Sequence, residues 1–350
     1  MKMEQDAAVA APDAAPPSAP LRLGLAGCGY QGRQLAAAAS LSPALSIVAC
    51  ADPDLAAAER TTELAKDAST HSSVESLLDD PAVDAVVVAT PHHLLCPVSL
   101  VVLRAGKHVL AEKPMALNAR EAAELETAAA RAGVRFMAGY SCRFSLARYV
   151  RDLLAEGVAG ELVAMTGAFY SGPFDRGWAA SVGTGGGPLL YLGSHLVDML
   201  LWFAGDNPVE VSGKIRRLGN GLDDTSAFQV VFSSGAVAQC LVTQAAPSFS
   251  YRVDIQGRAG RVMLHGTDFT HFEVEVENHV SQKFSKPTVI RPPAEGDHIA
   301  TMLVPELEEF ASAVRENRSP AINVADGKRV LQVLDAVVAA DRTGTVVQID

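Results

Sequence analysis

The sequence predicts an α/β protein with two domains: an N-terminal doubly wound parallel sheet, then an α+β domain with a large, open, mostly antiparallel sheet. Before residue 140, short apolar runs alternate with helical stretches, which is typical of parallel strands joined by right-handed crossovers. After residue 140, apolar and polar residues alternate with a period of two between turn residues, which indicates antiparallel strands with one covered face. We therefore expect a disordered tail at residues 1–20, a first domain at 21–140 and a second at 141–350.

The composition is that of an ordinary globular protein and argues against several kinds of partner. Hydrophobic residues make up 49% of the 350 residues and charged residues 20%. A net charge of −11 disfavours nucleic acid or an acidic membrane, and no apolar run is long enough to span a bilayer. Residues 1–20 lack the apolar core of a secretory signal. The five cysteines form no CxxC pair, which favours reduced thiols in the cytoplasm and no metal site.

A glycine-rich loop follows the first expected strand, at 21–26, and precedes an alanine-rich helical stretch. In this context GxGxxG is the fingerprint of a dinucleotide-binding turn, where glycines let the backbone approach a pyrophosphate at a helix N-terminus. Cys28 within the loop is expected to be a small filler. The cofactor contacts predicted here are Gly27, Gly29, Tyr30, Gln31 and Gly32.

Asp52 ends the second apolar run, at 47–51. It lies about twenty residues past the glycine loop, where a carboxylate can bind the ribose hydroxyls. A carboxylate there repels a 2′-phosphate, so NAD is favoured over NADP. The alternative is that Asp52 only starts the next helix, before Pro53.

Two further strands of the parallel sheet, at 84–89 and 108–111, end at Thr90-Pro91 and at Glu112-Lys113-Pro114. Because ligands bind at the carboxyl ends of parallel strands, we expect Thr90, Pro91, Glu112 and Lys113 at the nicotinamide end of the cleft. For Glu112-Lys113 the alternative is a solvated strand end with a surface ion pair.

His92 and His93 follow Thr90-Pro91. We interpret them mainly as a solvated loop pair, and we keep His93 as a predicted cofactor contact. The helices expected in this half span residues 54–66, 94–105 and 119–131, and a last strand spans 134–138.

The second half reads as a set of short strands, and such an open sheet face often becomes a subunit interface. We therefore expect a homodimer or homotetramer that forms through this sheet. Helices are predicted at 146–156, 303–316 and 324–340. Strands are predicted at 162–170, 209–217, 227–232, 236–243, 251–256, 262–264, 272–276 and 346–348.

One predicted helix, 189–203, is apolar nearly all round and follows three glycines and Pro188. A helix of this kind is buried. Tyr191, His195 and Asp198 lie at i, i+4 and i+7 and therefore share one face. Buried imidazole and carboxylate groups need partners, so we predict a site here, with a satisfied core histidine as the alternative. Trp178, in the loop ahead of the helix, could contact a substrate or anchor the loop.

Together these motifs resemble the glucose-fructose oxidoreductase / inositol dehydrogenase / MocA-type (Gfo/Idh/MocA) oxidoreductases. The resemblance rests on the glycine loop, on Ala105 to Pro114 with Glu112-Lys113-Pro114, and on Gly185-Gly186-Gly187 followed by Gly193-Ser194-His195 and Asp198. It implies a Rossmann domain, a second domain with an open sheet that is commonly paired between subunits, and NAD(P)-dependent oxidation of a secondary alcohol on a sugar or cyclitol.

The resemblance also implies roles for individual residues. Lys113 would be the active-site lysine and Pro114 would follow a cis bond. His195 would be the acid/base, and Asp198 would contact the substrate. Arg143, with Phe144, would lie in the segment that crosses between the domains, at the substrate.

Two positions depart from the family pattern. Tyr191 stands where many members carry Asp in DxGxH, and Leu95 stands where many carry His in TPxxxH. We expect Tyr191 to shape the sugar pocket while Lys113 and His195 carry out the proton transfer. With no carboxylate at position 191, the ammonium of Lys113 should lower the pKa of His195.

The predicted function is therefore NAD-dependent dehydrogenation of a carbohydrate or cyclitol. The first alternative is a redox-neutral glycosidase or epimerase that oxidises a sugar carbon and then returns the hydride. The second is a non-catalytic NAD-binding sensor, which an intact Lys113 and His195 argue against.

Overall fold

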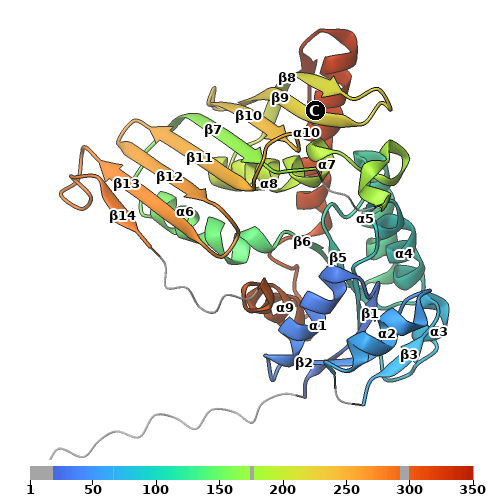
Figure 1. Ribbon diagram of the computed structural model, residues 1–350. Coiled ribbons are helices and arrows are strands. Elements are labelled where there is room, and N and C mark those ends of the chain that lie inside the picture. The colour runs from blue at the N-terminus through green and yellow to red at the C-terminus, as the bar shows by residue number, and fades with distance from the viewer. Residues whose placement is uncertain (1–18, 66, 174–176, 292–298, 350) are drawn as a thin grey trace, which may run out of the picture.

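The computed structural model describes residues 19–65, 67–173, 177–291 and 299–349, so residues 1–18 of the expected tail lie outside the described part. Two sheets form the molecule (Figure 1), with strand orders β3-β2-β1-β4-β5-β6 and β14-β13-β12-β11-β7-β10-β9-β8-β15. This architecture confirms the predicted fold class. No helix among the described residues is long and apolar enough to cross a membrane.

The first sheet is parallel throughout, and its strand order is the doubly wound one. Apart from the short edge strand β3, its strands are near-continuous apolar runs because helices cover both faces. Its strands are β1 (Leu21–Ala26), β2 (Leu45–Ala51), β3 (Ser69–His71), β4 (Ala85–Val88), β5 (His108–Glu112) and β6 (Phe136–Gly139). Its helices are α1 (Tyr30–Ser40), α2 (Leu55–Thr62), α3 (Val74–Leu78), α4 (His92–Arg104) and α5 (Ala119–Ala132).

Strand β3 and helix α3 are absent from the sequence prediction, and the expected helix 54–66 ends at Thr62. Three and five residues are too few to show a clear hydrophobic period. Helix α4 also begins at His92, two residues earlier than expected, which changes the surroundings of that histidine.

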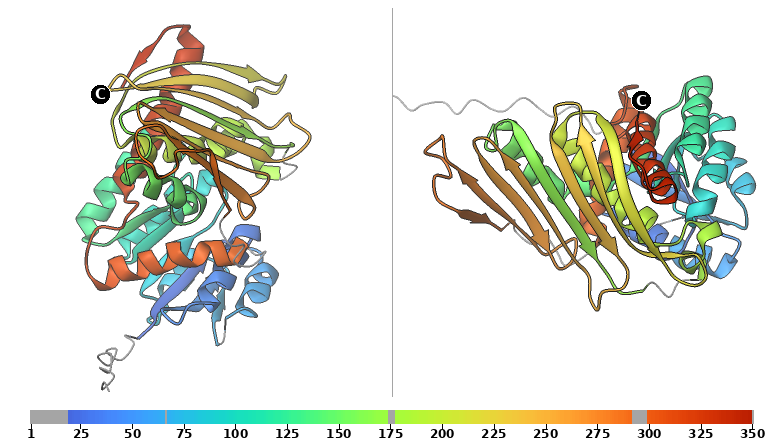
Figure 2. Two further views of the ribbon diagram at one scale, coloured as in Figure 1. Left: turned by 90° about the vertical axis from the view of Figure 1, so that its left-hand side faces the viewer. Right: turned by 90° about the horizontal axis from the view of Figure 1, so that it is seen from above.

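The second sheet is antiparallel except where β10 runs parallel to β7. Helices lie on one face of it and the other face is open (Figure 2). Its strands are β7 (Leu162–Tyr170), β8 (Pro208–Arg217), β9 (Asp223–Phe232), β10 (Val237–Thr243), β11 (Ser250–Gly257), β12 (Gly260–Gly266), β13 (Phe272–Asn278), β14 (Thr288–Ile290) and β15 (Val347–Gln348). Its helices are α6 (Leu146–Ala155), α7 (Pro188–Tyr191), α8 (Gly193–Ala204) and α10 (Val324–Thr343).

Helix α9 (Ile299–Arg315) returns to the first sheet although it follows the second in sequence (Figure 1). Its Leu303, Leu307 and Phe310 belong to the same buried cluster as Leu23 and Leu25 of β1. The chain therefore crosses between the sheets more than once, and the crossings hold one sheet against the other.

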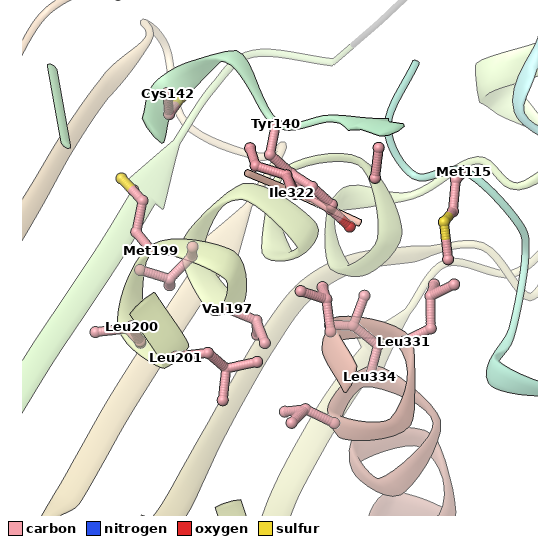
Figure 3. Close-up of a cluster of buried hydrophobic side chains, with 14 of the residues drawn as sticks. Met115, Tyr140, Cys142, Val197, Met199, Leu200, Leu201, Ile322, Leu331 and Leu334 are labelled. Atoms are coloured by element: carbon pink, nitrogen blue, oxygen red, sulfur yellow. The ribbon is translucent and has the colours of Figure 1, made fainter. Parts of the chain in front are cut away.

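A buried apolar cluster lies where these crossings meet (Figure 3). Val197 and Leu201 of α8 are drawn beside Leu331 and Leu334 of α10. Cys142 comes from the short 3-10 helix Ser141–Phe144 (η1), which leads from the first sheet to the second. The side chains of this cluster pack α8 against α10 and η1.

Candidate active site

One cleft of about 1350 Å³ is lined by residues from both sheets and brings together most of the predicted site residues. The predicted residues that line it are Gly27, Gly29, Tyr30, Gln31, Asp52, Thr90, Pro91, Glu112, Lys113, Trp178, Tyr191 and His195. Four predicted residues do not line it: Gly32, His93, Arg143 and Asp198.

The glycines of the loop have different structural roles. Gly27 has a φ of +97°, and a Cβ there would lie 2.7 Å from the carbonyl of Ala89. A Cβ at Gly32 would overlap the carbonyl oxygen of Gly27, so Gly32 lets α1 pack against the turn. Gly29 has open space around it and lines the cleft. Because α1 begins at Tyr30 without a side-chain cap, its N-terminus suits a phosphate.

Asp52 supports the glycine loop and also lines the cleft. Its Oδ2 accepts a hydrogen bond from the backbone N–H of Cys28 at 2.8 Å, and its Oδ1 accepts one from Asp54 at 2.9 Å. The helix cap is Asp54, whose side chain accepts from Ala56. Asp52 is therefore not the cap of α2, and its position suits the ribose contact that the sequence predicts.

Glu112 is tied into the first sheet and does not pair with the ammonium of Lys113. Its Oε1 accepts from Nε2 of Gln31 at 2.8 Å and its Oε2 accepts from the backbone N–H of Lys113 at 3.1 Å. Burial raises the pKa of Glu112 above its ordinary value, although Lys113 and the hydrogen bonds oppose this shift. Gln31 therefore connects α1 to the end of β5.

Lys113 reaches across the cleft to Tyr191. Its Nζ donates to the backbone carbonyl of Tyr191 at 3.3 Å and lies 4.3 Å from the centre of that ring. The Lys113–Pro114 peptide bond is cis, as the resemblance implies. Burial lowers the pKa of Lys113, although the carboxylate of Glu112 opposes the shift. A cation over an aromatic face is stabilised without a counter-ion.

His92 is buried, and the interpretation of this residue as part of a solvated loop is wrong. It is 4% exposed, because α4 begins at this residue and turns it inward. Its Nδ1 lies 2.7 Å from the carbonyl oxygen of Gly185, and its ring contacts Trp178 and Tyr191. Burial, together with the charge of Lys113, lowers the pKa of His92 to about 3. His93 does not line the cleft, so the predicted cofactor contact is not supported.

His195 lies on α8 and lines the same cleft as Lys113. Its Nδ1 lies 3.6 Å from the sulfur of Cys142, and its ring centre lies 5.5 Å from that of Phe269. Burial lowers the pKa of His195 well below its ordinary value, and the positive charge of Lys113 adds to this shift. The sequence predicts this lowering of the pKa of His195, but burial contributes more to it than the charge of Lys113 does.

The predicted helix 189–203 is interrupted at Leu192, between α7 and α8. Tyr191 and His195 line the cleft on either side of this break, whereas Asp198 is fully buried behind it. Asp198 accepts hydrogen bonds from Arg143 at 2.6 and 3.0 Å. The predicted substrate contacts of Asp198 and Arg143 are therefore corrected: these residues satisfy each other and join η1 to α8.

Comparison with known proteins places this site in a family. A model of an oxidoreductase family with an NAD-binding Rossmann fold matches residues 21–140, and a model of the GFO/IDH/MocA C-terminal domain matches residues 147–263. The chain belongs to the Gfo/Idh/MocA oxidoreductase family. It is an NAD(P)-dependent oxidoreductase, and the cofactor class predicted from the glycine loop is confirmed.

Several relatives of this Gfo/Idh/MocA protein resemble it over most of their length. A 1,5-anhydro-D-fructose reductase of Ensifer adhaerens is 32% identical over 291 residues, which are 80% of this chain and 84% of the relative. A trans-1,2-dihydrobenzene-1,2-diol dehydrogenase of Danio rerio is 31% identical over 232 residues, or 65% of this chain and 69% of the relative. The structure of GenD2 from gentamicin A biosynthesis, in complex with NAD, has a TM-score of 0.83 and 25% identity, and covers 98% of this chain and 100% of that one.

Other lining residues of this Gfo/Idh/MocA site were missed because they come from loops and from a distant helix. Ser72 and Ser73 precede the unpredicted helix α3, and Phe249 and residues 267–271 lie beside strands of the second sheet. Met302 and Leu303 come from α9. None of these positions carries a local pattern that distinguishes it from an ordinary turn or an amphipathic helix.

Proposed function

We propose that this protein oxidises a secondary alcohol of a sugar, sugar derivative or cyclitol, with hydride transfer to NAD. The observation that carries the proposal is the presence of Lys113 and His195 in one cleft with the glycine loop. Two groups of complementary chemistry, a cation and a neutral imidazole, thus lie near the cofactor groove. The names of two relatives, an anhydrosugar reductase and a cyclic diol dehydrogenase, support a ring alcohol as substrate.

The fit to a dinucleotide comes from the chain itself. Gly27 and Gly29 leave room for a pyrophosphate at the uncapped N-terminus of α1, and Asp52 lies where the ribose hydroxyls would bind. When bound, NAD supplies the hydride acceptor.

His195 would act as the general base. Its lowered pKa keeps the imidazole neutral at pH 7, so that it can accept the hydroxyl proton as the C–H hydride leaves. Lys113 would stabilise the developing alkoxide with its ammonium. Tyr191 holds that ammonium with its carbonyl and its ring, which is the contribution we assign to it in place of the family's aspartate.

Replacement of Lys113 by Ala tests these roles. We expect Lys113→Ala to reduce turnover roughly 100-fold to 1000-fold, a range typical for the loss of a group that stabilises a developing oxyanion. NAD affinity, measured by fluorescence titration, should change little. The control is Lys286→Ala, which removes an exposed lysine that does not line the cleft. Unchanged turnover in Lys113→Ala would contradict the proposed role.

An NADH-absorbance screen against inositols, aldoses, anhydrosugars and glycosides separates the net oxidation from its alternatives. Steady NADH formation supports a dehydrogenase. Product without NADH would favour the redox-neutral glycosidase or epimerase, and tight NAD binding without any turnover would favour a sensor.

We also propose that the open face of the second sheet forms the interface of a homodimer or homotetramer. Thr166 of β7 is exposed and alternates with buried Met165 and with Gly167, which faces Leu196 of α8, and no helix covers the face of Thr166 in Figures 1 and 2. The mass in solution, measured by light scattering, tests this assignment.

The five cysteines are all free, which supports a reducing compartment such as the cytoplasm.

A further inference from the structure

The side chain of Gln31 joins the glycine loop to the reactive lysine through one carboxylate. Gln31 lies in that loop and in the first turn of α1, and it lines the cleft. Its Nε2 donates to Oε1 of Glu112 at 2.8 Å, and Oε2 of Glu112 accepts from the backbone N–H of Lys113 at 3.1 Å. The carboxylate is therefore fixed at the end of β5, next to the residue that carries the ammonium.

The ammonium of Lys113 lies in surroundings that disfavour its charge. Its direct partners are the carbonyl and the ring face of Tyr191, and no carboxylate among the described residues forms an ion pair with it. Burial lowers the pKa of Lys113, and the charge of Glu112 has the largest opposing effect. Whether Lys113 stays protonated therefore depends on whether Glu112 is ionised.

The other titratable groups that act on Lys113 carry no negative charge near neutral pH. They are His92 of α4, His195 of α8 and Cys142 of η1. Both imidazoles are neutral because burial lowers their pKa and the charge of Lys113 lowers it further. The thiol is neutral because burial raises its pKa. Glu112 is therefore the group that can support the ammonium.

Glu112 itself needs help to stay ionised. It is 8% exposed, and burial raises its pKa. A second buried carboxyl, Glu306 of α9, has its pKa raised well above the ordinary value by burial and then by the charge of Glu112, so Glu306 holds a proton and Glu112 carries the charge.

Three effects oppose the burial of Glu112: the charge of Lys113, the hydrogen bond from Gln31 and the hydrogen bond from the backbone of Lys113. Gln31 is the one of the three that does not come from Lys113 itself. The amide of Gln31 therefore favours the ionised form of Glu112 whatever the state of the lysine.

We propose that Gln31 is a positioning residue for catalysis: its amide holds Glu112 as a carboxylate, and this carboxylate keeps Lys113 in the ammonium form. This inference rests on the proposed function, in which the ammonium stabilises the developing alkoxide. Glu112 thus supplies from below the cleft the negative charge that Tyr191 does not carry.

The basic limb of the pH profile tests this role, measured with saturating NAD and the best substrate of the NADH screen. Gln31→Met keeps the length of the side chain and removes the amide donor. Glu112 should then take up a proton, and the ammonium of Lys113 should be lost at a lower pH, so the basic limb of kcat/KM should move to lower pH. Where wild-type kcat/KM has fallen to half its maximum on this limb, Gln31→Met should be at least roughly threefold less active.

The matched control is Gln34→Met, because Gln34 lies on the same helix and does not line the cleft. Its profile should match that of the wild type. An unchanged basic limb in Gln31→Met overturns the proposal. A basic limb that moves to higher pH also overturns it, because the released carboxylate would then pair with the ammonium.

A second variant shows whether Gln31 acts through Glu112. Glu112→Gln removes the negative charge directly and should also move the basic limb to lower pH. When Gln31→Met is added to Glu112→Gln, the limb should move no further, because the charge is already absent. Additive movements of the limb would show that Gln31 does not act through this carboxylate.

Competitive acetylation of Lys113 with acetic anhydride, read by mass spectrometry, reports its ionisation without turnover. An amine reacts in its neutral form, so Lys113 should become reactive at a lower pH in Gln31→Met than in the wild type. Equal reactivity overturns the role of Gln31, even where Lys113→Ala loses turnover as expected. A shifted reactivity with full turnover in Lys113→Ala would instead refute the proposed function and leave the role of Gln31 in place.

Discussion

The sulfur of Cys142 lies 3.6 Å from Nδ1 of His195, and both residues are buried. Burial raises the pKa of the Cys142 thiol well above its ordinary value, and the negative charge of Asp198 adds to this shift. The partner of the imidazole is therefore a neutral thiol and not a carboxylate, so it gives little stabilisation to an imidazolium. The other ring nitrogen, Nε2, is left as the one that can meet a substrate. Cys142 thus acts as a positioning residue for His195.

Removal of this thiol should change the pH profile as well as the rate. Oxidation needs the neutral imidazole, so the acid limb of the kcat profile follows the pKa of His195, below its ordinary value of 6.5. In Cys142→Ala the buried Nδ1 of His195 loses its partner, so the acid limb of the kcat profile should move to still lower pH. A hydroxyl is a stronger hydrogen-bond partner than a thiol, so the acid limb of Cys142→Ser should lie at a higher pH than that of Cys142→Ala. Loss of ring orientation should lower kcat roughly threefold to tenfold in Cys142→Ala.

The control for this experiment is Cys240→Ala, which removes another buried thiol that does not line the cleft. Its pH profile should match that of the wild type. Superimposable profiles for wild type and Cys142→Ala would show that the contact with His195 does not position the ring.

The ion pair between Arg143 and Asp198 should be structural. Asp198→Asn leaves a buried guanidinium without its counter-charge, so we expect the free energy of unfolding to fall by about 3–5 kcal/mol. The exposed pair Arg148–Asp152 is a matched control, and Asp152→Asn should cost about 0–1 kcal/mol. Urea denaturation measures both. A stable Asp198→Asn protein with a raised KM would instead restore the substrate contact expected from the sequence.

Glu306 of α9 is fully buried, and neither of its carboxyl oxygens has a hydrogen-bond partner among the described residues. Burial raises the pKa of Glu306 well above its ordinary value, and the charges of Glu112 and Asp198 add to this shift. The folded state therefore holds a proton that the unfolded state releases near pH 4.5. Between the pKa of Glu306 in the unfolded chain and its raised pKa in the folded protein, the free energy of unfolding falls as pH rises.

Replacement of Glu306 by Met should therefore stabilise the protein. At pH 7 the gain should be about 1–3 kcal/mol, because an apolar side chain of similar length replaces an unsatisfied polar group. Glu306→Gln should remove the pH dependence but keep an unsatisfied amide, and so should gain less. Thermal unfolding from pH 5 to pH 8 measures both effects. A lower melting temperature for Glu306→Met would mean that the carboxyl makes a stabilising interaction.

Gly29 and Gly32 should respond differently to alanine. In Gly32→Ala the new methyl group meets the carbonyl of Gly27, so we expect a loss of stability of about 1–3 kcal/mol. In Gly29→Ala the methyl group enters open space at a φ of −72°, so the fold should be unaffected. That space faces the cleft, however, and we expect NAD affinity to fall at least roughly tenfold.

Thermal unfolding and NAD titration of the two variants separate the packing effect from the binding effect. Gly29→Ala protein that binds NAD as well as the wild type would contradict the assignment of the pyrophosphate to this loop.

The local patterns in the sequence determined the two sheets, the glycine loop with Asp52, and the residues Lys113, Tyr191 and His195 that meet in the cleft. These features depend on hydrophobic period and on turn chemistry, which a few neighbouring residues express. Only the tertiary structure decided which polar groups face the cleft. His92 turns inward, Asp198 turns away to Arg143, and Phe249 and Phe269 come from loops beside strands of the second sheet, more than fifty residues past His195. Burial and pairing of this kind arise from contacts between distant segments, which no local spacing records.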